Sequence, residues 1–259
     1  MRKPLWTYLA CCTAVFMISM DNLIVTNALP VIRQALNTGL EGLEWTVNAY
    51  TMTFAVLLLT GAALGDRFGR RRLLIIGVAV FTAASAASAM APNIDALIAA
   101  RAVQGIGAAI VTPLTVTLIA SVTPPQRRGM ALGLWGATAG LGAALGPVIG
   151  GAVTDAASWQ WIFWINVPIG IAVLPLLLLT RESRSGAGRL DPAGVILATA
   201  GLFGIVFGLV RGNSHGWTSA QVLGSLAGGG VLFAGFLAWE SRAANPMLPL
   251  SLFLSLIHI

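Results

Sequence analysis

The sequence has very little charge. Of its 259 residues, 9% are Asp, Glu, Lys or Arg and 57% are hydrophobic, whereas soluble domains carry about 25% charged residues. The mean hydropathy is +0.85. A water-soluble fold of this length could not cover its surface with so few charges, so the composition predicts an integral membrane protein.

The sequence also lacks the residues needed for a disulfide framework, a metal site or a catalytic set. The two cysteines, Cys11 and Cys12, are neighbours inside an apolar run and cannot join distant segments, which excludes a disulfide framework. The two histidines, His215 and His258, lie far apart, and no cluster has metal-ligand spacing. No Ser–His–Asp set or pair of catalytic carboxylates can be assembled. We therefore expect no catalytic residue, no metal and no cofactor, and a protein that is not an enzyme.

Long apolar runs, in contrast, are abundant. A membrane-spanning helix needs about 20 mainly apolar residues, and eight runs of about this size occur. They cover residues 5–30, 45–65, 73–91, 97–120, 130–153, 161–180, 192–210 and 222–239. They are apolar on all sides and longer than the alternating strands of a β-barrel, and the first is too long for a cleaved signal peptide. The expected fold is an all-α integral membrane protein with about eight spans in a lipid bilayer.

The basic residues predict the orientation of these spans. An even number of spans places both termini on one side, and cytoplasmic loops are enriched in Lys and Arg. Of the 15 basic residues, 12 fall on the side of the termini, namely Arg2, Lys3, Arg67, Arg70, Arg71, Arg72, Arg127, Arg128, Arg181, Arg184, Arg189 and Arg242. Because this charge is divided among separate loops, it does not form a patch for nucleic acid. We expect a multi-pass protein of the cell membrane with both termini in the cytoplasm.

One polar segment divides the chain. Residues 181–194, "RESRSGAGRLDPAG", are charged and glycine-rich, which is typical of a cytoplasmic linker. It separates a six-helix bundle at 1–180 from two additional helices at 195–240. Residues 241–259 are expected to be a cytoplasmic tail. They finish in "LSLIHI", which is too short for another span, so we expect a truncated end.

Two ionisable residues lie inside the spans, where a charge costs roughly 3 kcal/mol or more and indicates function by default. Asp21 lies in the outer part of the first run and Arg101 early in the fourth, so that water or a cavity could reach both. Asp21 is either a polar residue that fixes helix tilt or a carboxylate that binds a proton or a cationic substrate. Arg101 either snorkels to the surface or faces the bundle interior, where it polarises a carboxylate or water beside Gln104. We favour the interior position.

The fifth run, "GLWGATAGLGAALGPVIGGAV", has small residues at helical spacing. Intervals of four residues separate the members of two series, Gly136 and Gly140, and Gly142, Gly146 and Gly150. Such spacing lets helix backbones approach closely. Pro147 removes a backbone hydrogen bond and predicts a bend in the membrane. We expect tight packing, and with it a bending element in a protein that changes shape.

Two motifs resemble signatures of the major facilitator superfamily. The charged loop "GDRFGRRR" is similar to the signature between its second and third helices, in which the matching residues are Asp66, Arg67, Gly69, Arg70 and Arg71. The usual glycine four positions before the aspartate is Ala62 here. "RAVQGIG" resembles the motif of the fourth helix, carried by Arg101, Gln104, Gly105 and Gly107.

Three further motifs resemble the fourteen-helix drug:proton antiporter branch and exporters in general. The fifth-helix exporter motif is carried by Gly142, Gly146, Pro147, Gly150 and Gly151. "MDNLIVTNALP" is similar to the first-helix motif of the branch, on Asp21, Asn27 and Pro30. "WQWIFWINVPIG" resembles its sixth-helix entry, on Trp159, Trp161, Phe163, Asn166, Pro168 and Gly170. Gln160 stands where an arginine is common.

The resemblance implies proton-coupled export of hydrophobic or cationic small molecules, with the proton gradient as the energy source. Two six-helix bundles would rock around a central site. Asp21, Arg101 and Gln104 would couple protons to substrate, and the charged loop would latch the bundles in the outward-facing state. A facilitator or importer on the same fold, and a non-transporting membrane scaffold formed by the half-molecule, are the alternatives.

The resemblance also implies a missing partner. Members of the branch continue for six more helices, and these carboxy-terminal helices are absent from this sequence. A truncated reading frame and a half-molecule that pairs with another chain both stay open. We expect Arg71 and Arg72 to act as topology signals. Asp66, as an acid, is expected to meet a helix N-terminus or an arginine, and the loop to act on the missing bundle.

Overall fold

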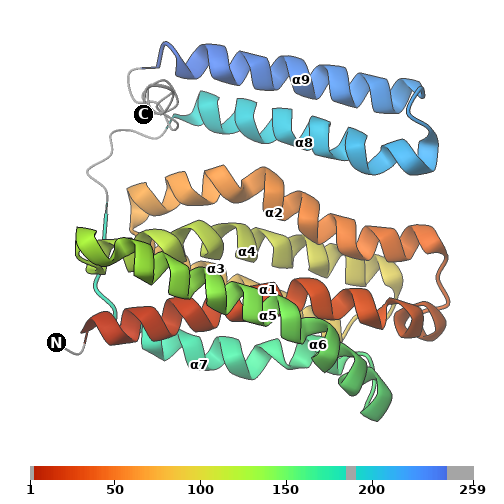
Figure 1. Cartoon of the computed structure of the whole chain (residues 1–259). Helices are drawn as coiled ribbons and strands as arrows, with labels where there is room; N and C mark the ends of the chain where they lie inside the picture. Colours follow the sequence, from red (N-terminus) through yellow and green to blue (C-terminus); the bar gives the residue numbers. More distant parts are fainter. Residues whose placement is uncertain (1–2, 185–190, 244–259) are drawn as a thin grey trace.

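Helices dominate the part of the chain that the computed structural model describes, residues 3–184 and 191–243 (Figure 1). They are α1 (Lys3–Ala35), α2 (Leu40–Phe68), α3 (Arg70–Ala89), α4 (Ile94–Val122), α5 (Arg128–Ala156), α6 (Trp161–Trp164), α7 (Asn166–Leu178), α8 (Pro192–His215) and α9 (Ala220–Glu240). A short 3₁₀ turn, η1 (Pro125–Arg127), precedes α5. No strand occurs in these ranges, which confirms the all-α fold.

Eight helical segments of the described chain are long and apolar enough to cross a membrane, with α6 and α7 together forming one of them. The protein is therefore a multi-pass membrane protein, as predicted. Several helices extend beyond their apolar runs. For example, α1 continues through Pro30 to Ala35, and α2 includes Asp66. Hydropathy marks the part of a helix that crosses lipid, whereas its backbone hydrogen bonding continues to where charged side chains reach water.

The sixth span is interrupted, although its sequence predicts one continuous run. Helix α6 ends at Trp164 and α7 begins at Asn166. Pro168 has no N–H with which to bond the carbonyl of Trp164, so the regular ladder is broken at this point. Asn166 is the first residue of α7 and is fully buried.

Helices α1 to α7 form one bundle, and α8 and α9 lie as a pair beside α2 (Figure 1). The Thr60 hydroxyl of α2 lies 3.1 Å from the Thr199 hydroxyl of α8. Within the pair, a Cβ added to Gly204 would lie 2.8 Å from the Cα of Gly229, so the two backbones are in close contact. The two additional helices thus pack tightly on each other and contact the bundle through α2.

The predicted close packing of the fifth helix is confirmed, and its partner is α1. A Cβ added to Gly142, Gly146 or Gly150 would lie 2.6 to 2.9 Å from a backbone oxygen of α1. Side chains there would force the helices apart. Asn27 of α1 adds a hydrogen bond across this interface, because its Nδ2 donates to the carbonyl of Pro147 at 2.9 Å. The other predicted series, Gly136 and Gly140, makes no such contact, because a Cβ added to either of them, or to Gly151, would meet nothing within 4 Å.

The apolar core forms two clusters along the bundle. One contains Ile18 of α1 and Ala108 of α4, and the other contains Ile24 of α1 and Leu97 of α4. Along both helices, the predicted functional residues fall between the two clusters. The bundle therefore has an apolar layer on each side of a polar one.

Candidate functional site

Asp21 and Arg101 form a buried ion pair at this polar level. Arg101 Nη1 lies 2.6 Å from Asp21 Oδ2, and the side chains are 1% and 0% exposed. Arg101 therefore faces the interior, as predicted. The expectation that water or a cavity reaches the two residues is wrong for this conformation. One reason is that α1 continues past Pro30, which places Asp21 near the middle of the helix rather than in its outer part.

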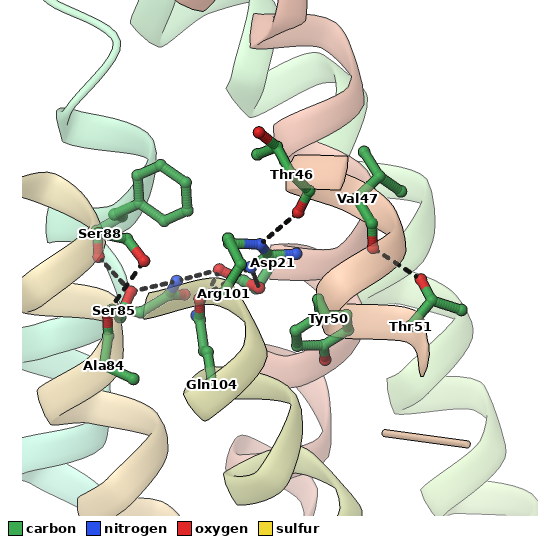
Figure 2. A network of polar contacts seen from close by, with 12 residues as sticks. Asp21, Thr46, Val47, Tyr50, Thr51, Ala84, Ser85, Ser88, Arg101 and Gln104 are labelled. Carbon is green, nitrogen blue, oxygen red and sulfur yellow. Dashed lines mark hydrogen bonds and ion pairs between the residues drawn. The ribbon is translucent and has the colours of Figure 1, made fainter. Parts of the chain in front are cut away.

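Gln104 joins the ion pair from the next turn of α4. Its Oε1 accepts a hydrogen bond from Arg101 Nη1 at 2.8 Å, and its Nε2 donates to Asp21 Oδ1 at 2.9 Å (Figure 2). The three residues predicted to act together therefore do lie together. Residues three apart on a helix share a face, which explains how one segment supplies both partners of the carboxylate.

Two further polar residues complete the cluster, which we call the Asp21 cluster: Asp21, Ser85, Arg101, Gln104 and Asn166. Asn166 Nδ2 donates to Asp21 Oδ1 at 2.6 Å and to Ser85 Oγ at 3.1 Å. Ser85 Oγ donates in turn to the carbonyl of Phe163 at 2.9 Å. Asn166 was predicted only as part of the sixth-helix structural motif, and Ser85 was not predicted. The asparagine beside the proline of a span was a usable signal, whereas the serine was not.

The guanidinium of Arg101 is held by more than its carboxylate. Its Nε donates to the carbonyl of Thr46 on α2 at 3.3 Å. Its carbon lies 4.2 Å from the centre of the Tyr50 ring and 5.8 Å from that of Phe163, both within cation–π range. A buried arginine needs hydrogen-bond partners as well as a counter-charge, and α1, α2 and α4 supply them for Nε and Nη1.

The Asp21 cluster is built around an ionised carboxylate. Asp21 accepts hydrogen bonds from Arg101, Gln104 and Asn166, and each of these partners acts as a donor. Helices α1, α4 and α7 meet at this one side chain, and α3 joins them through the bond between Ser85 and Asn166. A proton on Asp21 would cancel the charge that Arg101 balances and would remove acceptor capacity. The arrangement is therefore sensitive to protonation by construction.

Other predicted residues lie outside this cluster. Trp161 is 56% exposed, and together with Pro168 it lines an apolar groove of about 740 Å³ beside the end of α5. Pro30 borders a separate groove at the end of α1 that also contains Arg33. Asn27 bonds α5, as described above. These residues shape the bundle surface and its helix contacts rather than the buried site.

The charged loop between α2 and α3 forms a second polar cluster at the bundle surface. Arg70 Nε and Nη2 both lie 2.7 Å from Asp66 Oδ1, so Asp66 meets an arginine as expected. Gly69 joins the two helices with φ of +108°, a value that side-chain-bearing residues rarely adopt. Arg67 lies over the Phe68 ring at 5.8 Å.

Glu182 binds the start of α3 and was not predicted. Its carboxylate accepts hydrogen bonds from the backbone N–H of Arg71 at 3.0 Å and of Arg72 at 3.3 Å. Gly69 offers no side-chain cap, so Glu182 satisfies these free amides and places an anion at the positive end of the helix. The one signal in the sequence was an acid among the arginines of the expected linker.

The loop therefore also has partners within this chain, in addition to the missing bundle on which we expect it to act. Ser183 accepts the backbone N–H of Arg70 at 3.0 Å. Arg71 Nη1 donates to the carbonyl of Thr180 at 3.1 Å, so Arg71 is more than a topology signal. Residues 180–183 lie against the loop because α7 ends beside the start of α3. We call Asp66, Gly69, Arg70, Arg71 and Glu182 the loop cluster.

Comparison with known proteins identifies relatives over nearly the whole chain. The profile of the Major Facilitator Superfamily matches residues 9–258. The chain is 37% identical over 256 residues to the tetracenomycin C resistance and export protein of Streptomyces glaucescens, covering 98% of this chain and 48% of that protein. It is 43% identical over 248 residues to the cephamycin export protein CmcT of Amycolatopsis lactamdurans, covering 93% and 51%.

Solved structures share the fold. A peptide transporter POT (E310Q mutant, in complex with sulfate) superposes with a TM-score of 0.66 at 18% identity, over 94% of this chain and 53% of that one. The POT family transporter PepTSo gives 0.67 at 14% identity, over 91% and 52%. At such identities the likeness concerns the fold alone. The chain spans about half the length of the curated relatives it matches, and it belongs to the major facilitator superfamily.

Proposed function

We propose that this chain is the amino-terminal portion of a proton-coupled exporter of hydrophobic or cationic small molecules. The observation that carries the proposal is the Asp21 cluster, a carboxylate fully buried among three hydrogen-bond donors. The names of the relatives, which include antibiotic resistance and export proteins, support the direction of transport and the substrate class. The proton gradient serves as the energy source, and no cofactor takes part.

In this mechanism Asp21 carries the proton. When it is ionised, Arg101 and Gln104 hold it and α1 is tied to α4. When a proton binds, the charge that holds Arg101 is lost, and α1 becomes free to move relative to α4. The glycine interface between α1 and α5 has few side chains in the way, so α1 can tilt there.

Transport also needs a second bundle. This carboxy-terminal bundle, supplied by further sequence or by another chain, completes the substrate path and forms, with the amino-terminal bundle, the pair that rocks around the central site. The protein lies in the cell membrane with both termini in the cytoplasm, where the loop cluster meets that bundle in the outward-facing state. Its partners are lipid, protons and the small-molecule substrate, and nucleic acid is not among them.

A transport assay tests the proposal. Ethidium, a hydrophobic cation, is added outside everted vesicles that contain the complete exporter, and its uptake into the vesicles is followed with and without a protonophore. We expect Asp21→Asn and Arg101→Ala to abolish proton-driven movement at normal expression. Ser88→Ala removes a buried hydroxyl that bonds only its own helix and should leave transport unchanged. Unaltered transport in both cluster variants, or transport that persists without the gradient, contradicts the proposal.

A further inference from the structure

Asn166 is the member of the Asp21 cluster whose hydrogen bonding is one-sided. Its Nδ2 donates to both Asp21 and Ser85. Its Oδ1 is buried and has no hydrogen-bond partner among the described residues. An amide that uses its donors twice and its acceptor not at all is oriented by a neighbouring negative charge rather than by balanced bonding.

We propose that Asn166 is a hydrogen-bond switch that reports the protonation of Asp21 to the interrupted sixth span. The inference rests on the proposed function, because it takes Asp21 as the proton-binding group. In the ionised state, the Asp21 carboxylate holds Nδ2 toward itself. The amide is thereby fixed, and the Ser85 hydroxyl is left to donate to the carbonyl of Phe163.

Protonation reverses this orientation. When one proton binds to Asp21 Oδ1 and points toward Asn166, that atom becomes a donor and faces the donor Nδ2 of Asn166, while its remaining lone pair still accepts from Gln104 Nε2. A half-turn of the amide about its Cβ–Cγ bond presents the unused Oδ1 instead, which accepts the new O–H. No other covalent bond forms or breaks in this step.

The reversal then reaches α6 through Ser85. With Oδ1 turned toward it, the Ser85 hydroxyl can donate to Asn166 and no longer donates to Phe163. The carbonyl of Phe163 therefore loses a donor next to the break at Ile165, where the helical ladder is already interrupted. The Phe163 ring also lies 5.8 Å from the guanidinium carbon of Arg101. A movement of Phe163 would therefore alter the surroundings of the Asp21–Arg101 ion pair.

The charged groups near Asp21 can keep their positions while Asn166 and Ser85 exchange hydrogen-bond partners. The titratable or charged groups around Asp21 are Arg101 from α4 and Tyr50 from α2, whose ring lies over Arg101. From α3 and α7 come the neutral side chains of Ser85 and Asn166. Arg101 keeps its bonds to Gln104 and to the Thr46 carbonyl when Asp21 is neutral. Asn166 and Ser85 are positioning residues that act through Asp21.

Infrared titration of the purified chain in lipid nanodiscs tests the switch without transport. The carboxyl band that disappears in Asp21→Asn reports the protonation of Asp21. We expect Asn166→Leu to displace the pH response of this band, because the carboxylate loses a charge-assisted hydrogen bond. In protein labelled with ¹³C at the phenylalanine carbonyls, the signal assigned by Phe163→Leu should change with pH in step with that band.

Ser85→Ala is the second variant and cuts the relay while leaving the bond between Asn166 and Asp21. It should abolish the pH response of the Phe163 carbonyl, whereas Ser88→Ala, a buried serine three residues along α3, should preserve it. An unshifted titration in folded Asn166→Leu overturns the switch, as does a Phe163 response that survives Ser85→Ala. An Asp21 band that does not respond to pH at all also overturns it. Failure of the proposed function would be seen separately, as proton-driven transport that is unchanged in Asp21→Asn.

Discussion

The Asp21 cluster and the loop cluster contain the same type of ion pair in opposite surroundings. Arg101 and Asp21 are 2.6 Å apart and 1% and 0% exposed, whereas Arg70 and Asp66 are 2.7 Å apart and 17% and 37% exposed. The two pairs have nearly equal distances but contribute differently to the free energy of unfolding. Water and salt screen the loop pair, but in the bundle each charge depends on its partner. Loss of either charge should therefore disturb the buried pair far more than the loop pair.

Breaking the buried ion pair should cause the largest loss of stability among the variants considered. Arg101→Met leaves Asp21 buried without its counter-charge, and we expect a loss of about 3 to 5 kcal/mol of unfolding free energy. Circular dichroism during titration with dodecyl sulfate in mixed micelles measures it. The double variant Asp21→Asn with Arg101→Met should recover part of the loss, because no lone charge remains. Equal stability of Arg101→Met and wild type would contradict the burial of an ionised pair.

The backbone that carries Asp21 offers a second way to disturb the buried cluster. Gly146→Leu places a side chain against the carbonyl of Met20 and should cost about 1 to 3 kcal/mol by separating α1 from α5. Gly140→Leu is the matched control, since nothing lies within 4 Å of its Cβ position, and its cost should stay below about 0.5 kcal/mol. The same micelle titration compares them. A similar loss for both variants would refute the α1–α5 contact.

Within the loop cluster, Glu182 should matter more than the ion pair. Glu182→Gln weakens the anionic cap of α3, and we expect a local loss of about 1 kcal/mol at the start of that helix. Hydrogen exchange of the Arg71 and Arg72 amides should accelerate, while exchange in the middle of α3 stays constant. Glu41→Gln, an exposed acid that pairs with Arg211, serves as the control. Unchanged exchange at both amides would show that Glu182 does not cap α3.

The smallest effect is expected at the exposed pair itself. Asp66→Asn should cost between about 0 and 1 kcal/mol, and the difference from wild type should vanish in about 1 M salt. Stability measured at low and high salt decides this. A salt-independent loss as large as that of Arg101→Met would mean that the two ion pairs are energetically alike, and the contrast between the clusters would be lost.

The sequence could predict the parts of the buried site that are chemically unusual in a membrane span. Asp21 and Arg101 are conspicuous because charge is rare there, and Gln104 shares a helix face with Arg101. Ser85 could not be found in this way, since serine is ordinary in a span and only packing brought it beside Asn166. The role of Glu182 could not be predicted either, because it lies more than 100 residues from the amides it caps.

The amino-acid sequence by itself determined that the protein crosses the membrane in about eight helices, because hydropathy and length follow directly from composition along the chain. It also determined which helices can approach closely, since glycine spacing is local. Only the tertiary structure decided that Asp21 pairs with Arg101, that Asn166 bonds the same carboxylate, and that Glu182 caps the start of α3. Those contacts join segments distant in sequence, and local physical rules do not specify which distant helix faces meet.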